Sequence, residues 1–212
     1  DKKYIAMENM EKYLIDKENN IVKLLTPPFE NEEFKPGYIA SYAPGMRENG
    51  GQYTHAAIWG AIAETILNKP EEAMEIYKMI NPIEHSKTEE QMVKYKVEPY
   101  VVEADIYGEN EFAGRGGWTW YTGSSGWLFT LQTEYILGLK IYHGELKIKP
   151  CVPKDWNEFE VDFKWKNAKY HIKYERKNSG IDNKDGKQEK NNNLNENKQI
   201  LDLNNDNVQM YL

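Results

Sequence analysis

The sequence lacks the features of several broad protein classes. It has one cysteine, Cys151, so it cannot build an internal disulfide framework, and this suits a reducing compartment. No hydrophobic run approaches the ~18 residues of a membrane span, and no apolar signal region stands at the start. The formal net charge is -7, without the basic excess of nucleic-acid-binding proteins. We therefore expect a cytoplasmic protein whose chain contacts neither membrane nor nucleic acid.

The length and the ends of the chain bear on its organisation. Its 212 residues suffice for one domain or two small ones. The chain begins with Asp1 rather than methionine, and it stops within a run that is typical of a strand. We expect it to be a piece of a longer polypeptide.

Helices are expected first. Apolar residues at helical spacing predict helices over residues 2–16, 56–67 and 71–80. Ser86 or Thr88, followed by Glu89–Gln91, predicts a capped short helix. A further apolar helix is expected over residues 127–140, with Gly138 near its end. Helices joined by short turns are typical of layered or toroidal folds.

Strands are expected afterwards. Three runs, 144–149, 158–166 and 167–176, alternate apolar with charged residues and predict a β-meander with one solvated face, on which His171 faces solvent. Residues 177–199 are polar and Asn-rich, which predicts a flexible insertion before the sheet resumes. The fold class is therefore segregated α+β, with domains over residues 1–142 and 143–212.

A long irregular segment precedes the second helix. Residues 18–52 contain repeated prolines and glycines, and structureless segments of this length are usually functional or disordered. The segment also carries Phe29, Phe34, Tyr38 and Tyr42. These aromatic residues favour an ordered segment that faces a ligand.

The end of this segment leads into a helix. Arg47 and Glu48 precede the pair Gly50–Gly51, and His55 lies in the expected first turn, where N–H groups and the helix dipole favour an anion. Alternatively, His55 is a core residue beside Trp59, and Arg47 and Glu48 form a solvated pair. The adjacent glycines favour a positioned pair.

Residues 112–126 combine glycines with large aromatic residues. Glycine weakens a helix or strand, so a cluster of glycines usually marks an unusual backbone or a close approach. This segment is either a tight turn with core tryptophans or a ligand-binding loop whose N–H groups can hold an anion. The residues in question are Gly114, Arg115, Gly116, Gly117, Trp118, Trp120, Tyr121, Thr122 and Gly123.

Carboxylates crowd the approach to this loop. They could serve as a general acid, as hydrogen-bond acceptors for sugar hydroxyls, or in the structure alone. His85 nearby is expected at the surface. The carboxylates are Glu98, Glu103, Asp105, Glu109 and Glu111.

Four ordered motifs carry a family resemblance over about residues 5–176. They are R-E-N-G-G-Q-Y-T-H from Arg47, Y-K-V-E-P-Y-V-V from Tyr95, G-R-G-G-W-T-W-Y-T-G-S-S-G-W from Gly114 and L-K-I-K-P-C-V-P-K-D-W from Leu146. They resemble the C-terminal half of inverting glycoside phosphorylases related to cellobiose phosphorylase. The resemblance is stronger to the branch of 1,2-β-oligoglucan phosphorylase and cyclic β-1,2-glucan synthase.

The resemblance implies a fold and a reaction. The fold is the C-terminal part of an (α/α)6 toroid followed by antiparallel strands of a sandwich-like domain. In the reaction, phosphate attacks the anomeric carbon while an aspartic acid protonates the leaving oxygen, so only one catalytic acid is needed. No metal or cofactor is implied beyond phosphate as co-substrate. The implied partner is a β-glucan oligosaccharide, and a homodimer stays open.

The resemblance also implies roles for individual residues. His55, Thr122 and Gly123 match phosphate-binding positions, and Arg47 and Glu48 match residues that contact the acceptor sugar. Trp118, Trp120 and Tyr121 then shape the pocket wall, unless Trp120 belongs wholly to the core.

The chain departs from the family pattern in three places. The catalytic aspartate of an Asp-Trp-Asn-Asp type motif is missing, and Asp155-Trp156-Asn157 lies among strands and is rejected. A phosphate-binding arginine of the earlier half is also missing. Glu103-Ala104 stands where cellobiose phosphorylases have Ala-Gln, which favours another linkage specificity. We expect the catalytic acid upstream and the isolated chain to be inactive.

Four hypotheses on function stay open. The first is phosphorolysis of β-1,2-oligoglucans by a longer enzyme, and the second is a C-terminal module that controls chain length in a cyclic glucan synthase. The third is another disaccharide phosphorylase or an inverting hydrolase. The fourth is a carbohydrate-binding module without catalysis.

Overall fold

A computed structural model of the chain describes residues 2–30, 36–120, 122–176, 198–203 and 206–211. The chain divides into two compact units, Asp1–Pro153 and Lys154–Leu212. The boundary expected at 142/143 falls inside the first unit, which contains the hairpin of β5 (Leu139–Tyr142) and β6 (Glu145–Ile148). The architecture is α+β, a mixture of helices and small antiparallel sheets.

The first unit holds all the described helices. They are α1 (Lys2–Leu14), α2 (Thr54–Ile66), α3 (Pro70–Ile80), α4 (Glu89–Tyr95) and α5 (Thr122–Thr130), with the 3-10 turns η1 (Gly37–Ser41), η2 (Glu84–Ser86) and η3 (Asn110–Phe112) and the π-helical segment η4 (Leu131–Ile136). As predicted, Thr88 caps α4 through a capping box with Gln91.

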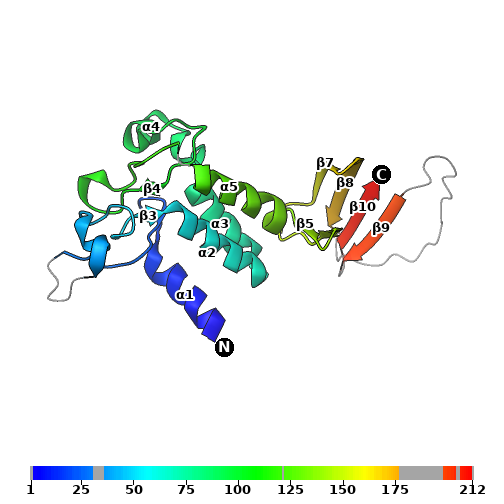
Figure 1. Cartoon of the computed structure of the whole chain (residues 1–212), viewed down its shortest axis with the longest axis horizontal. Coiled ribbons are helices and arrows are strands. Elements are labelled where there is room, and N and C mark those ends of the chain that lie inside the picture. The colour runs from blue at the N-terminus through cyan, green and yellow to red at the C-terminus, as the bar shows by residue number, and fades with distance from the viewer. Residues whose placement is uncertain (1, 31–35, 121, 177–197, 204–205, 212) are drawn as a thin grey trace. The chain divides into compact units, whose positions relative to one another are not determined.

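The core of the first unit forms where α2 lies beside α3 and α5 (Figure 1). Ile58 and Ala61 of α2 are fully buried, as are Ala73 and Ile76 of α3. The alanines let the two helix backbones approach closely, while the isoleucines supply apolar area removed from water. This packing fixes the start of α2, where the expected anion site begins.

The helix predicted over residues 127–140 differs from the observed one. It begins five residues earlier, at Thr122, and ends as the π-helical η4 before Gly138. Residues 122–126 are thus the first turns of α5 rather than a loop. Their glycines disfavour a helix, but buried Ser124, Leu128 and Leu131 tie this segment to the unit, so tertiary contacts outweigh local propensity.

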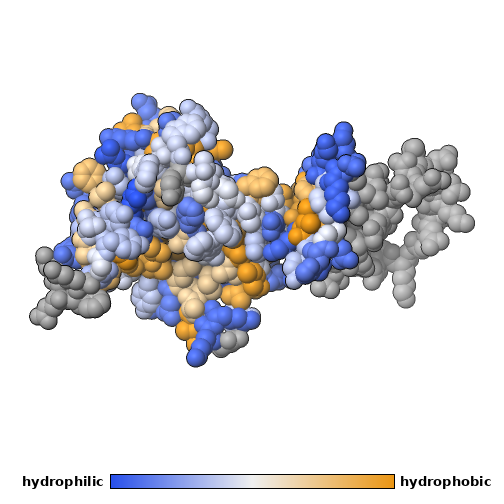
Figure 2. All heavy atoms as spheres, viewed as in Figure 1, coloured by the Kyte–Doolittle hydropathy of each residue, from blue (hydrophilic) through white to orange (hydrophobic). Residues whose placement is uncertain are grey.

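Helix α1 presents apolar side chains to solvent. The sequence predicts an amphipathic helix here, and none of its residues is buried. Figure 2 shows apolar residues gathered over the region of α2, and large side chains exposed on these two helices include Ile5, Trp59 and Ile66. The apolar stripe of α1 therefore has no complete cover within the described residues.

Three two-stranded antiparallel sheets complete the first unit. Strand β1 (Ile15–Asp16) pairs with β2 (Ile21–Val22), and β3 (Gln52–Tyr53) pairs with β4 (Asp105–Ile106). The third sheet is β5 with β6. The predicted meander is wrong for the run at 144–149, because β6 pairs with β5 and not with the strands that follow. The β3–β4 pair brings the start of α2 next to the carboxylate-rich segment.

The second unit is a four-stranded antiparallel sheet in the order β7-β8-β10-β9. Its strands are β7 (Glu158–Trp165), β8 (Ala168–Arg176), β9 (Lys198–Leu203) and β10 (Asp206–Tyr211). The two predicted strands 158–166 and 167–176 and their tight turn are confirmed. So is the return of the sheet after the polar segment. The expected flexible insertion lies outside the described residues up to residue 197, and residues 198–199 begin β9.

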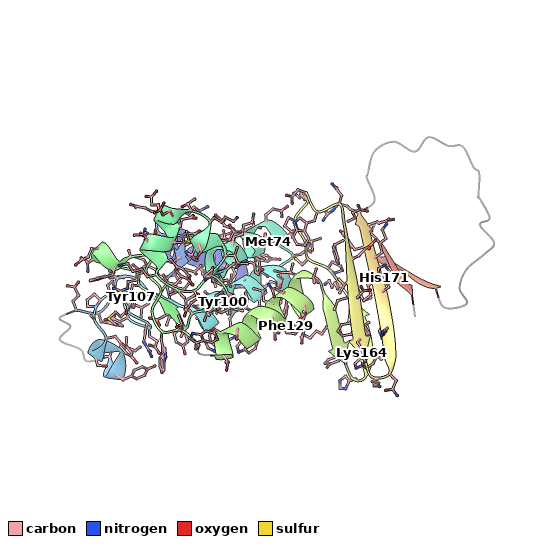
Figure 3. The ribbon with its side chains drawn as sticks, turned by 90° about the horizontal axis from the view of Figure 1, so that it is seen from above. Met74, Tyr100, Tyr107, Phe129, Lys164 and His171 are labelled. Atoms are coloured by element: carbon pink, nitrogen blue, oxygen red, sulfur yellow. The ribbon has the colours of Figure 1, made fainter. Side chains whose placement is uncertain are left out.

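The two faces of β7 and β8 differ as the alternation predicts. Phe159 stacks on buried Tyr174 at 4.8 Å between ring centroids, whereas His171 is half exposed and contacts Asp162. Figure 3 places His171 on β8 and Lys164 on β7. The expectation that His171 faces solvent is confirmed.

Candidate active site

The expected anion site lies where α2 and α5 begin. His55 is in the first turn of α2, and Gly123 is in the first turn of α5. A Cβ atom on Gly123 would lie 2.6 Å from His55 Nε2, so the imidazole ring rests directly against this glycine. The structure therefore brings His55 next to Thr122 and Gly123, although His55 and Thr122 are 67 positions apart in the chain (122 minus 55).

The surroundings suit an anion. Thr122 and Gly123 are exposed and His55 is half-buried, so a ligand can reach all three. The first N–H groups of a helix have no partner within the helix, and the dipole favours negative charge there. Burial lowers the pKa of His55, so the ring is neutral at neutral pH and can donate one N–H to an oxyanion. Tyr53 stacks on the ring at 5.5 Å between centroids and orients it.

Arg47 and Glu48 occupy the tip of a tight turn closed by the bridge between Met46 and Asn49. The Arg47 guanidinium lies 4.5 Å from the ring centroid of Trp118 and 5.6 Å from that of Tyr42. One carboxylate oxygen of Glu48, Oε2, is buried without a hydrogen-bond partner among the described residues. Both side chains are half-buried, and Arg47 lies over two aromatic rings, so the two residues are not fully solvated as the alternative requires.

Asn49 holds the long irregular segment to this turn. It is fully buried, and its side-chain amide forms hydrogen bonds with both backbone polar groups of Phe29. The Phe29 N–H donates to Oδ1 at 2.7 Å, and Nδ2 donates to the Phe29 carbonyl at 2.9 Å. Nδ2 also donates to the Tyr42 carbonyl at 2.8 Å. The described parts of the segment are thus ordered, as expected. Phe34 lies outside the described residues.

Asp105 fixes the aromatic–glycine segment. Its Oδ1 accepts the Trp118 backbone N–H at 3.0 Å, and a Cβ on Gly117 would lie 2.5 Å from Oδ2, so only glycine fits there. Burial raises the pKa of Asp105, while the Trp118 N–H and the Arg47 charge oppose that effect. Asp105 therefore joins the segment to the Arg47 turn.

The tryptophans of this segment are not core residues. Trp118 is 52% exposed and Trp120 is 66% exposed. Trp120 and Tyr100, which is labelled in Figure 3, form an edge-to-face pair at 6.4 Å between ring centroids. The core alternative for Trp120 is wrong, and flat exposed rings of this kind can face a sugar. Tyr121 lies outside the described residues.

Glu103 is buried beneath the anion site. It is 0% exposed, and burial raises the pKa of its carboxyl to about 7. Tyr95 Oη donates to its Oε2 at 2.5 Å, while Thr54 Oγ1 and Gln52 Nε2 donate to Oε1 at 3.0 and 3.4 Å. A fully buried group cannot reach substrate, so of the three roles left open for the carboxylates, Glu103 has the structural one.

The amino-acid sequence of the chain matches the sequence model of a known protein family. The model for the glycosyl hydrolase 94 superfamily, catalytic domain, matches residues 1–138. The chain belongs to this superfamily. Three of the four motifs that carried the resemblance lie within the matched residues, and the predicted family is confirmed.

Curated relatives of this glycosyl hydrolase 94 chain include a synthase and phosphorylases. The chain is 46% identical over 171 residues to cyclic beta-(1,2)-glucan synthase NdvB of Rhizobium meliloti (strain 1021), covering 81% of this chain and 6% of that protein. It is 33% identical over 171 residues to N,N'-diacetylchitobiose phosphorylase of Vibrio proteolyticus (80% and 21%) and 29% identical over 161 residues to solabiose phosphorylase of Paenibacillus borealis (73% and 20%). The chain thus spans about a fifth or less of these relatives.

The remaining candidate residues of the glycosyl hydrolase 94 chain lie apart from the anion site. Glu98 and Glu111 are exposed, and Glu109 pairs with Lys23 at 2.8 Å. His85 is only 6% exposed, so its expected surface position is wrong. It turns inward from η2, stacks on Tyr95 at 4.8 Å between centroids and contacts the Met79 carbonyl through Nε2.

The described residues contain neither a candidate membrane span nor a cluster of metal-ligating side chains. No described helix is both long and apolar enough to cross a bilayer. No group of three or more His, Cys, Asp or Glu side chains in the described part of the chain is arranged to hold a metal ion. A cavity of about 420 Å³ lies between the β1–β2 turn and α4, and it includes none of the predicted site residues.

The buried carboxyl of Glu103 predicts a pH dependence of stability. Its folded pKa of about 7 is above the ordinary value of 4.5, so the folded state binds more protons between these values and stability falls as pH rises through that window. Each unit of raised pKa corresponds to about 1.4 kcal/mol. The unfolding temperature of the wild-type protein minus that of Glu103→Gln should therefore decrease from pH 5 to pH 7.5.

The exposed Glu98 supplies the control for this measurement. Glu98→Gln removes the same charge from a solvated position, so its difference from the wild-type protein should stay constant over the same pH range. An equally constant difference for Glu103→Gln would show that Glu103 does not change protonation on unfolding.

Proposed function

We propose that the full-length protein carries out reversible, inverting phosphorolysis of β-1,2-linked glucooligosaccharides, releasing α-glucose 1-phosphate. In this proposal the chain supplies the phosphate side of the active site through His55, Thr122 and Gly123. The observation that supports it is the contact of His55 Nε2 with Gly123 at the two helix starts. The superfamily match and the phosphorylase names of two relatives agree with phosphate as the attacking group.

The proposed reaction assigns each residue a task. A phosphate oxygen attacks the anomeric carbon while the bond to the glycosidic oxygen breaks, and an upstream carboxylic acid gives that oxygen its proton. His55, the Thr122 hydroxyl and the Gly123 N–H hold the other phosphate oxygens. They thereby orient the nucleophile and spread its charge. Because phosphate needs no deprotonation by a base, this chain need not contain one.

The sugar side of the proposal rests on Arg47 and Glu48. The Arg47 guanidinium lies over the rings of Trp118 and Tyr42, and its N–H groups can donate to sugar hydroxyls. The carboxylate of Glu48 has an oxygen without a partner among the described residues, and a sugar hydroxyl can donate to it. Together they would bind the acceptor sugar.

A second candidate is the C-terminal module of a cyclic β-1,2-glucan synthase that adjusts chain length by the same chemistry. The 46% identity to a protein of that name favours it. Both candidates share the β-1,2-glucan and the phosphate site, and they differ in what precedes this chain. Membrane spans encoded upstream would favour the synthase.

Three further expectations belong to this proposal. The helices of the first unit would form part of an (α/α)6 toroid, and the second unit part of a sandwich-like domain. The full-length protein would work in the cytoplasm without a metal or cofactor. The isolated chain would be inactive, because the catalytic acid lies upstream.

Incubation of the full-length protein with β-1,2-glucooligosaccharides tests the proposal. We expect α-glucose 1-phosphate to appear only when inorganic phosphate is present, and residues 1–212 alone to release none. Chitobiose and cellobiose serve as alternative substrates. Release of free glucose without phosphate would indicate a hydrolase instead, and preference for another disaccharide would refute the proposed linkage.

A further inference from the structure

Glu103 connects to both helices that form the anion site. Its carboxylate accepts the hydroxyl of Thr54, which directly precedes His55 in α2. Its backbone carbonyl accepts the hydroxyl of Ser124, which directly follows Gly123 in α5, at 3.1 Å. The next residue, Ala104, accepts the Thr54 backbone N–H at 3.0 Å. Residues 103 and 104 thus contact a direct neighbour of His55 in α2 and a direct neighbour of Gly123 in α5.

The Glu103 carboxylate accepts hydrogen bonds from two further side chains, those of Tyr95 and Gln52. Tyr95, at the end of α4, donates to Oε2 and is itself fixed by stacking on His85. Gln52 donates to Oε1, and its own side-chain oxygen accepts the Val22 N–H at 2.9 Å. Because both carboxylate oxygens accept hydrogen bonds, from residues of α4, β3 and α2, a shift of Glu103 would disturb contacts with all three elements.

We infer that Glu103 is a positioning residue for the phosphate site, which keeps the starts of α2 and α5 at the spacing that lets His55 and Gly123 hold one anion together. The inference rests on the proposed function in taking inorganic phosphate as the ligand.

The role depends on geometry rather than on charge. A full negative charge under an anion site would repel the ligand, and burial raises the pKa of Glu103 to about 7, which favours the neutral form. Glutamine is neutral and nearly isosteric. Glu103→Gln should therefore keep most of the contacts, whereas Glu103→Ala leaves three buried donors without an acceptor.

Calorimetric titration of the full-length protein with inorganic phosphate tests the inference. We expect Glu103→Ala to weaken phosphate binding about tenfold, as loss of ~1.4 kcal/mol would. Glu103→Gln should stay within about threefold of the wild-type protein, because a neutral partner can take over most of the hydrogen bonds. The KM for the glucan at saturating phosphate should be unchanged in both, a split that general destabilisation would not produce.

A milder pair of variants covers the case in which Glu103→Ala does not fold. Thr54→Val removes only the hydroxyl bonded to Glu103, and should weaken phosphate binding about fivefold, the effect of one hydrogen bond of ~1 kcal/mol. Thr65→Val is the matched control, since the Thr65 hydroxyl bonds the Ile62 carbonyl at the other end of the same helix. It should bind phosphate as the wild-type protein does.

Each outcome bears on one of the two proposals. Unchanged phosphate affinity in Thr54→Val and in folded Glu103→Ala overturns the positioning role, as does an equal change in the glucan KM. Phosphate binding that depends on Glu103 in a protein without phosphorolysis supports the positioning role and refutes the proposed function. A wild-type protein that binds no phosphate refutes both.

Discussion

His55→Ala in the full-length enzyme is expected to raise the KM for phosphate about 10- to 100-fold, the effect of losing a hydrogen bond to a charged group worth ~1.5–3 kcal/mol. The glucan KM should change little, because His55 rests against the start of α5, whereas the proposal assigns the acceptor sugar to Arg47 and Glu48. Initial rates of α-glucose 1-phosphate release, measured while each substrate is varied separately, give both constants.

A histidine of the second unit provides the control. His171→Ala removes a half-exposed imidazole of β8 that is paired with Asp162 of β7. Both Michaelis constants should stay at their wild-type values. If His55→Ala left the phosphate dependence unchanged, His55 would not belong to the phosphate site, and the assignment of Thr122 and Gly123 would lose its main support.

Gly123→Ala is expected to reduce kcat/KM for phosphate by a similar or larger factor. The new methyl group would lie 2.6 Å from His55 Nε2, closer than atoms in contact can approach. Moving the ring requires only a side-chain rotation, so the fold should survive while the imidazole leaves its place. A displaced hydrogen-bond donor costs roughly 100-fold in rate, which can be read from saturation curves for phosphate.

Gly126→Ala on the same helix is the matched control. A Cβ there would meet no atom within 4 Å, so the substitution adds a methyl group to open space. Alanine favours a helix over glycine by ~1 kcal/mol, and this variant should be fully active and slightly more stable. Equal losses of activity in both variants would mean that α5 tolerates no alanine, and would remove the special role of the contact with His55.

The part of the site that the sequence could predict depends on neighbours along the chain. His55 follows a Gly-Gly turn and precedes an apolar helix, and Thr122-Gly123 stands within an unusual mixture of glycines and aromatics. Both are local signals with a physical meaning, a helix start and an exposed backbone. That they meet in space came from the family resemblance, because nothing in either motif refers to the other.

The residues that support the site could not be predicted in this way. Glu103 and Asp105 looked like their exposed neighbours in a row of carboxylates, since burial depends on β3–β4 pairing between distant segments. Nothing in the sequence around Asn49 indicates that its side chain is buried and binds the backbone of Phe29 and Tyr42. The surface position predicted for His85 was wrong because its ring stacks on Tyr95 at the end of α4. No local pattern around His85 indicates that contact.

The errors in secondary structure have a common physical cause as well. Glycine and serine at 123–126 disfavour a helix locally, yet α5 begins there because Ser124 is bonded to Glu103 and Leu128 is buried. The alternation at 144–149 does identify a strand, but alternation does not specify the partner strand. Both cases were decided by tertiary contacts that period and propensity do not encode.

The hydrogen bonds around Glu103 also determine when the site can form during folding. Glu103 bonds Gln52, Tyr95 and Ser124, and Gln52 in turn accepts the Val22 N–H, so the network closes several long loops at once. Closing a long loop costs entropy before any contact compensates it, so contacts between distant segments form late. The anion site would therefore be among the last parts of the first unit to form. A chain interrupted anywhere between Val22 and Ser124 could retain its helices and still lack the site.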